Sequence, residues 1–300
     1  FFTALLFAIH PVQVETVCWI SASKIVLSTF FYLSALICYI QYMRNSKWQY
    51  LLASVVSSIL AMGCKEQSVI IVPCLLLFDW MLFKRNMRSL KVYIEKVYYL
   101  IPAIAIFIVT LVANKDTGEE IIGYTIVDRF IFLCYSVFKY LLISAIPFKL
   151  SYLYPFPFQV GEKIPMALWI YPFVILFIGY VIYLNRRKPL LVFCTLFFIL
   201  HLLPVLHVIP LPRYVVVADR YLYIPYIAFA IGLSILSYHL YERQRKWILY
   251  AGFLYCSYLC VYTASYAPAW KNSDTLKEHF KEVLKKRETN LSINFKHEKQ

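Results

Sequence analysis

The chain has 300 residues, of which 61% are hydrophobic and 15% are charged, and its mean hydropathy is +0.66. Soluble domains have about 45–50% apolar and roughly 25% charged residues, so this composition excludes an ordinary soluble protein. The net charge of +14 would indicate nucleic acid in a soluble protein, but basic loops between membrane spans explain it here. We therefore expect an all-α polytopic membrane protein that has no nucleic-acid partner.

Apolar segments follow one another along the whole chain, and about 20 apolar residues suffice for a helix to cross a bilayer. We expect nine or ten such segments, some of them short. They cover residues 1–9, 25–43, 50–62, 69–83, 97–113, 130–148, 167–184, 190–206, 221–240 and 247–267.

The loops between these segments differ in charge. The basic loops should lie in the cytoplasm, because positive residues concentrate on that side of a membrane. They hold Arg44 and Lys47; Lys84, Arg85, Arg88 and Lys91; Arg186, Arg187 and Lys188; and Arg243, Arg245 and Lys246. Loops 10–24, 63–68, 114–129 and 207–220, and the tail from 268, are then expected on the other side. Acidic residues gather in one of them, namely Asp116, Glu119, Glu120 and Asp128.

Segment 130–148 breaks this alternation, because both of its flanking loops are predicted on the outer side. Lys139 in its middle and Pro147 at its end favour a re-entrant or interfacial segment, and the alternative is one miscounted span. The aromatic residues of 152–158 are typical of a membrane–water boundary.

The composition changes again at Pro268. We predict a multi-span membrane domain over residues 1–267 and a soluble amphipathic helical tail over residues 268–300. Asn272 to Asp274 can cap a helix, and apolar residues then recur at helical spacing.

Three polar signatures interrupt the apolar segments: HPVQVE at 10–15, GCKEQS at 63–68 and ADRYLY at 218–223. In the first, Pro11 stops the preceding helix, which should expose His10 and Glu15 in a mouth on the outer side. A simpler interpretation is that both residues only polarise a loop.

The second signature places Lys65 and Glu66 between two closely spaced apolar segments. Ionisable residues at this depth are costly unless they are paired or face a polar cavity. Either they form a solvated pair at the interface, or Lys65 binds a phosphate while Glu66 orients it or a sugar hydroxyl.

The third signature places Asp219 and Arg220 at the start of segment 221–240. An Arg there can bind a phosphate bidentately, and a helix N-terminus itself favours anions. The alternative is an interfacial Arg–Asp anchor flanked by Tyr.

In this order and among these segments, the signatures resemble the transmembrane-and-TPR O-mannosyltransferase-like proteins of the GT-C glycosyltransferase superfamily. The likeness covers most of residues 1–280. It rests on LLFAIHPVQVETVCWISASKIVLSTFFYLSALICY, KEQSVIIVPCLLLFDW, VADRYLYIPYIAFAIGL and the later W…NSDTL.

The resemblance implies a GT-C-like helical bundle that transfers a sugar from a polyprenyl-phosphate donor to a protein or glycan acceptor. The site would lie on the non-cytoplasmic face of a bacterial inner membrane or of the endoplasmic reticulum. Arg220 would neutralise the phosphate leaving group, and Asp219 stands where relatives often carry Glu. The implied substrate-binding residues are His10, Glu15, Lys24, Lys65, Glu66, Asp219 and Arg220.

The chain also departs from the family pattern. Relatives carry an Arg and an Asp where this chain has Ser23 and Ile25, which leaves Lys24 alone. The family's catalytic carboxylate lies in the first outer loop, which we expect upstream of Phe1, so we expect a membrane-core fragment whose catalytic residue is unknown. That loop would also hold a divalent metal if one is used, and this chain implies none.

Two other functions stay open. The chain can be a non-catalytic membrane anchor that presents a TPR-type interaction domain, beginning with the tail helix. It can also be a transporter or polymerase of lipid-linked glycans, although such transporters typically have paired halves and broken helices at mid-membrane.

Overall fold

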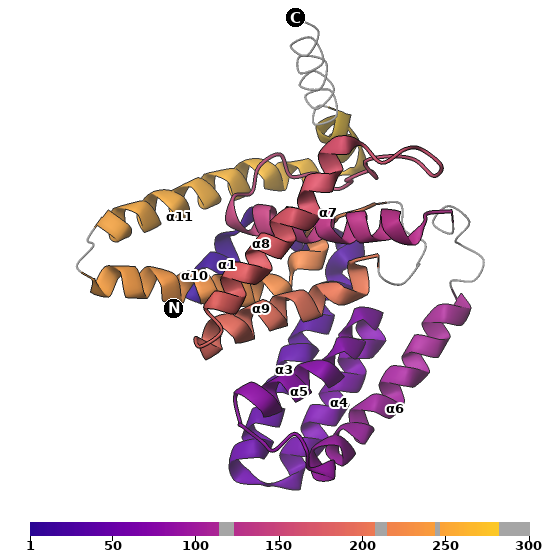
Figure 1. The fold of residues 1–300 in the computed structure, drawn as a ribbon, viewed down its shortest axis with the longest axis vertical. Helices are drawn as coiled ribbons and strands as arrows, with labels where there is room; N and C mark the ends of the chain where they lie inside the picture. The colour runs from indigo at the N-terminus through magenta and orange to yellow at the C-terminus, as the bar shows by residue number, and fades with distance from the viewer. Residues whose placement is uncertain (114–122, 208–214, 244–246, 282–300) are drawn as a thin grey trace, which may run out of the picture.

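The computed structural model describes residues 1–113, 123–207, 215–243 and 247–281, which form α-helices joined by short 3-10 turns (Figure 1). Every predicted apolar segment contains an α-helix, so the all-α prediction is confirmed for this part of the chain. The helices are α1 (Phe2–Ile9), α2 (Val14–Cys18), α3 (Ser23–Asn45), α4 (Trp48–Cys64), α5 (Ile71–Met81), α6 (Leu90–Ala113), α7 (Ile126–Ala145), α8 (Ile170–Leu184), α9 (Pro189–Leu202), α10 (Pro225–Glu242) and α11 (Trp247–Tyr266).

Four helical stretches are long and apolar enough to cross a membrane: Ile20–Asn45, Leu90–Ala113, Met166–Leu184 and Trp247–Trp270. Their apolar side chains are largely exposed; Phe173 and Phe253, for example, are 68% and 73% exposed. A soluble protein does not leave such continuous apolar surface in water. The chain is therefore an integral membrane protein, as its composition predicted.

The helices form two neighbouring groups (Figure 1). Helices α3, α4, α5 and α6 pack together, and α1, α10 and α11 pack together beside them. Helix α9 contacts both α5 and α10, so it joins the two groups. Segments that are far apart in the sequence thereby become neighbours, which allows the three polar signatures to meet.

Helix α7 covers most of segment 130–148. It is not among the four candidate spans, and it runs in a different direction from α3, α4 and α6 (Figure 1). Its predicted failure to cross the membrane stays a prediction. Of the aromatic residues after it, Tyr154 and Phe158 are buried, and Phe158 stacks on Phe132 with ring centroids 4.9 Å apart. The predicted position of 152–158 at a membrane boundary stays a prediction.

The tail begins as predicted. Asn272 Oδ1 accepts hydrogen bonds from the backbone N–H groups of Asp274 (3.0 Å) and Thr275 (2.8 Å), and residues 273–281 are helical. The Phe280 ring packs against Tyr152 with centroids 5.2 Å apart. Residues 282–300 of the predicted tail lie outside the described residues, as do the predicted loop residues Asp116, Glu119, Glu120, Arg245 and Lys246.

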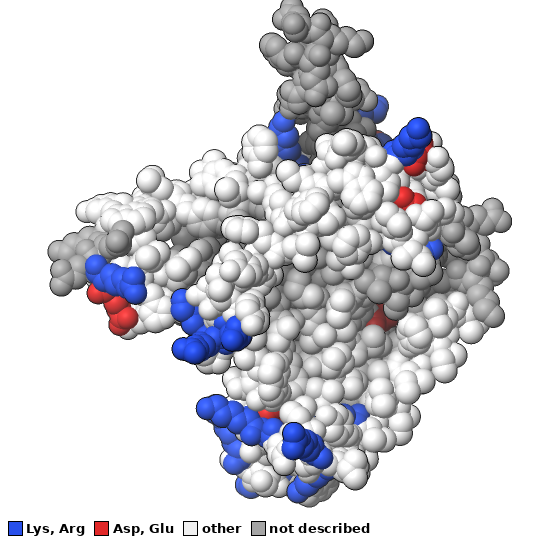
Figure 2. Space-filling view, viewed as in Figure 1, with Lys and Arg blue, Asp and Glu red and all other residues white. Residues whose placement is uncertain are grey.

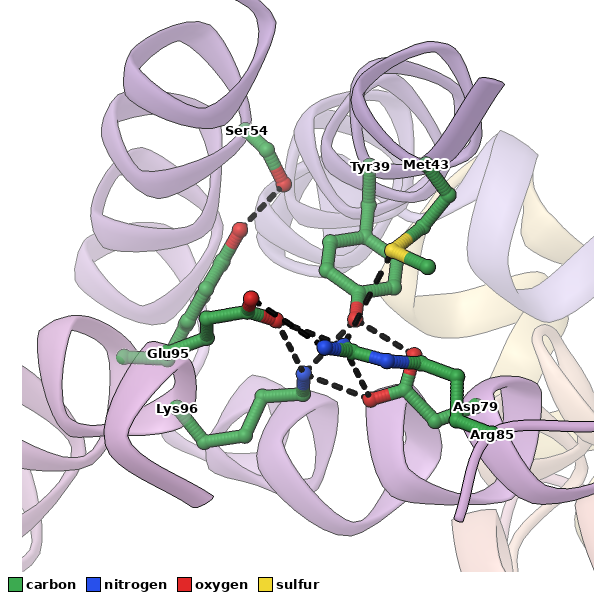
Figure 3. Close-up of polar contacts among 8 residues, drawn as sticks. Tyr39, Met43, Ser54, Asp79, Arg85, Glu95 and Lys96 are labelled. Carbon is green, nitrogen blue, oxygen red and sulfur yellow. Dashed lines mark hydrogen bonds and ion pairs between the residues drawn. The ribbon is translucent and has the colours of Figure 1, made fainter. Parts of the chain in front are cut away.

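A network of buried charges ties α3, α5 and α6 together (Figure 3). Asp79 is fully buried and accepts hydrogen bonds from Tyr39 Oη at 2.6 Å and Arg85 Nη1 at 3.3 Å, while Lys96 Nζ lies 2.6 Å from its Oδ2. Both Arg85 terminal nitrogens donate to Glu95, at 2.5 and 3.1 Å. Two acids and two bases therefore neutralise one another, and Arg85 fixes the loop between α5 and α6.

We predict that Asp79→Asn lowers the free energy of unfolding by about 3–5 kcal/mol, because removing one member of a buried charge set leaves the others uncompensated. Adding Lys96→Gln should restore at least about 1 kcal/mol of that loss, since the two residues are directly coupled. Chemical unfolding in detergent micelles measures both effects. The control is Glu278→Gln, which changes an exposed acid and should have little effect on stability. An effect of Asp79→Asn as small as that of the control would contradict the prediction.

Candidate functional site

The first and third signatures meet in a buried ion pair. Glu15 lies on α2 and is fully buried. Its Oε1 accepts a hydrogen bond from Arg220 Nη1 at 2.5 Å, and its Oε2 accepts one from the Arg220 backbone N–H at 2.9 Å. The guanidinium also lies 5.5 Å from the centre of the Trp19 ring. Two residues that are 205 positions apart are thus held in one fixed geometry.

Two predictions about these signatures are wrong. His10 and Glu15 do not line an exposed mouth, because both are fully buried: Glu15 is enclosed with its partner Arg220, and His10 packs inside the protein. Arg220 also does not open an α-helix. It lies in the four-residue 3-10 turn η6 (Asp219–Leu222), and α10 begins later, at Pro225, because proline suits the first helical turn.

His10 follows the end of α1 in an extended conformation, as expected for a residue before proline. Its ring packs on Tyr226 with centroids 4.3 Å apart, and its Nδ1 accepts the Val12 N–H at 3.3 Å. Burial lowers the pKa of His10 to about 3, so the imidazole is neutral at physiological pH. His10 is therefore an uncharged interior residue and no cationic ligand for a phosphate.

Asp219 lies beside the Glu15–Arg220 pair and is also fully buried. The Tyr154 hydroxyl donates a hydrogen bond to its Oδ1 at 2.9 Å. Gln13 and Thr16 are close to Glu15 in the sequence. Both side-chain amide atoms of Gln13 and the hydroxyl of Thr16 are buried and have no hydrogen-bond partner among the described residues. This side of the pair is consequently polar, although the surrounding helices are apolar.

The second signature forms its own pair. Lys65 Nζ lies 2.5 Å from Glu66 Oε1, and the side chains are 15% and 44% exposed. Burial alone would raise the pKa of the Glu66 carboxyl, but the Lys65 ammonium, with a smaller contribution from Lys24, lowers it below the ordinary value of 4.5. Lys24 itself is exposed at the start of α3. All three residues therefore belong to one neighbourhood, with Lys24 at its rim.

One small pocket joins the second and third signatures. Its walls include Lys65, Ser68 and Arg220, together with Ser28 of α3 and His201 of α9, and its volume is about 40 Å³. The Ser28 and Ser68 hydroxyl oxygens are 2.7 Å apart, and His201 Nε2 is hydrogen-bonded to Tyr32 Oη at 2.8 Å. Two cations and several hydroxyls on one pocket suit a small anion. A larger ligand has to extend beyond it.

Sequence patterns left several of these residues unnoticed. Tyr154 and Tyr226 carry no recognisable signal, because tyrosine is abundant throughout the chain, with 26 residues. Asp79 did carry one, since an acid inside an apolar segment marks a site by default. Its partners Glu95 and Lys96 fell just before predicted segment 97–113. Arg213, expected in the loop before the third signature, lies outside the described residues.

No group of three or more His, Cys, Asp or Glu side chains is placed to hold a metal ion within the described ranges. The cysteines described here are free. The site that the signatures build is therefore one of paired charges and hydroxyls, in which the buried Glu15 holds Arg220 and the partly exposed Glu66 holds Lys65.

We predict an asymmetric response at the Glu15–Arg220 pair. Arg220→Ala should cost about 3–5 kcal/mol of unfolding free energy, because it leaves a fully buried carboxylate unpaired. Glu15→Gln should cost less, because the Arg220 side chain is 20% exposed and can reach water. Chemical unfolding compares them with Glu242→Gln, which removes an exposed partner of His239 and should cost at most about 1 kcal/mol. Equal costs at Arg220 and Glu242 would refute the pairing.

The Lys65–Glu66 pair gives a pH dependence. A carboxyl whose pKa is lowered by folding contributes stability that is present above its unfolded pKa and lost as the pH falls through its folded pKa. Wild type should therefore be more stable than Lys65→Met near pH 7, and the difference should shrink as the pH falls below the ordinary Glu pKa of 4.5. Thermal unfolding from pH 3 to 7 measures this; a difference that grows on acidification would contradict it.

Comparison with known proteins does not assign this site. No protein-family model matches the chain, and neither the curated proteins nor the solved structures contain a significant match. The likeness to the O-mannosyltransferase-like proteins therefore rests on the sequence motifs alone.

Proposed function

We propose that this chain is the membrane core of a GT-C-type glycosyltransferase, which uses a polyprenyl-phosphate-linked sugar as donor. The observation that carries the proposal is the shared pocket of Lys65 and Arg220, with Arg220 held by Glu15. The second and third polar signatures supply these two cations, and Glu15 of the first signature holds Arg220 without lining the pocket itself. A lipid-linked phosphate is the anion that a membrane-embedded pocket of this kind fits.

The course of the helices supports a site on the side opposite the basic loops. Residues at one end of five helices lie at or near the pocket, and the other end of each helix meets a basic loop. Helix α3 ends beside Arg44, α4 begins after Lys47, α5 precedes Lys84, α9 follows Lys188, and α10 ends beside Arg243. Because basic loops concentrate in the cytoplasm, we place the pocket on the non-cytoplasmic side.

The chemistry follows from this charge. An acceptor hydroxyl oxygen attacks the anomeric carbon of the sugar, the carbon–oxygen bond to phosphate breaks, and the phosphate keeps the electron pair. Lys65 and Arg220 would stabilise the negative charge that develops on the leaving phosphate, and the buried Glu15 would keep Arg220 oriented. The hydroxyl proton passes to a base, for which the described residues give no assignment.

The two other functions predict different behaviour. A non-catalytic anchor with a TPR-type partner domain would tolerate neutral residues at Lys65 and Arg220 without losing its partner. A transporter or polymerase of lipid-linked glycans would move or extend the glycan without transferring a sugar to a protein. Neither is favoured by a specific contact in the described part of the chain.

The test uses Lys65→Gln, because Lys65 pairs with a 44% exposed carboxylate and its loss leaves no buried charge behind. Transfer from a polyprenyl-phosphate sugar, measured with the native protein in liposomes, should fall about 100-fold, as when one donor to a developing oxyanion is removed. Lys47→Gln removes the same charge at the opposite ends of α3 and α4 and should leave transfer unchanged. Undiminished transfer by Lys65→Gln would remove the pocket from the mechanism.

A further inference from the structure

A second cavity lies away from the proposed donor pocket. It is an apolar groove of about 440 Å³ between α5 and α9, within the range of about 300–1,000 Å³ for ligand sites. Pro73, Leu77 and Trp80 line it from α5, and Leu196 and Leu203 line it from α9 and the turn after it. These spacings place each set on one face of its helix. The groove therefore extends along both helices and suits a hydrocarbon chain.

One end of the groove is basic. Met87, which lines it, lies in the loop between α5 and α6 together with Lys84 and Arg88, both exposed. Arg85 of the same loop is already bound by Asp79 and Glu95, so the two exposed cations are the ones left for a ligand. The network of Figure 3 thereby holds the loop at the end of the groove.

The other wall of the groove adds to this charge. Helix α9 begins directly after Arg186, Arg187 and Lys188, all exposed. Figure 2 shows Lys and Arg side chains gathered along the lower left edge of the molecule, with few Asp or Glu among them. Trp80, near the basic end of α5, is 51% exposed, which leaves its ring accessible to lipid.

We propose that this groove binds an anionic phospholipid from the leaflet at the basic ends of the helices. One acyl chain would lie between α5 and α9, and the phosphate would meet the cations of the loop that holds Met87. The charge selects the occupant: a neutral lipid fills the groove equally well but gains nothing from Lys84 and Arg88, whereas each cation near a membrane surface favours an anionic headgroup about fivefold. This lipid is distinct from the sugar donor, whose phosphate is proposed at the other ends of the same helices.

Trp80 provides the readout. The intact protein is placed in nanodiscs of phosphatidylcholine that contain a small fraction of phosphatidylglycerol with brominated acyl chains, which quench nearby Trp fluorescence. Wild type minus Trp80→Phe isolates the Trp80 signal from that of the other Trp residues. The same measurement is made with an equal fraction of brominated phosphatidylcholine. We expect the quenching of Trp80 to correspond to a local concentration of brominated phosphatidylglycerol at least about fivefold higher than that of brominated phosphatidylcholine.

Lys84→Gln combined with Arg88→Gln should abolish this preference, while Arg44→Gln combined with Lys47→Gln removes equal charge from a neighbouring loop and should preserve it. Equal quenching by both brominated lipids in wild type would show that the groove is ordinary lipid-facing surface. An equal loss of the preference in both double variants would show that it comes from general attraction between basic loops and anionic lipid. Either result overturns the proposal. It is also overturned if a short polyprenyl phosphate displaces the brominated lipid, because the groove would then bind the sugar donor.

Discussion

The arrangement of the polar signatures depends on one buried ion pair. The Glu15 carboxylate is enclosed between α2 and η6, and both of its oxygens accept hydrogen bonds from Arg220, one from the side chain and one from the backbone. A carboxylate without water around it is costly unless its oxygens are satisfied, so the pair constrains where both segments lie. It also leaves Arg220 directed at the pocket that Lys65 shares.

The second charge cluster lies at the opposite ends of the helices and has a different character. Asp79, Glu95, Arg85 and Lys96 neutralise one another, so the cluster offers no net charge to a ligand. At the pocket, by contrast, Glu15 balances Arg220, Glu66 balances Lys65, and both cations still line a cavity. The same residue types thus form a closed network between helices at one end and place Lys65 and Arg220 on the wall of a pocket at the other.

We propose two places where a lipid phosphate fits, one toward each side of the membrane. The proposed donor site is small and is lined by hydroxyls and cations, as a headgroup requires. The groove between α5 and α9 is larger and apolar, and its cations stand only at one end, as an acyl chain with a headgroup requires. Helix α9 connects them, because its His201 lines the pocket and its Leu196 lines the groove.

The sequence by itself determined the helical segments, since apolar length sets where a chain can cross a membrane and Pro11 ends the first helix whatever lies around it. The family resemblance grouped His10, Glu15, Lys24, Lys65, Glu66, Asp219 and Arg220 as substrate-binding residues, which stays a prediction. Only the tertiary structure decided how they pair: Glu15 with Arg220 across 205 positions, Lys65 with its neighbour, and His10 buried against Tyr226. Burial and partner choice depend on which helices pack together, and local residue patterns carry no record of contacts made between distant segments.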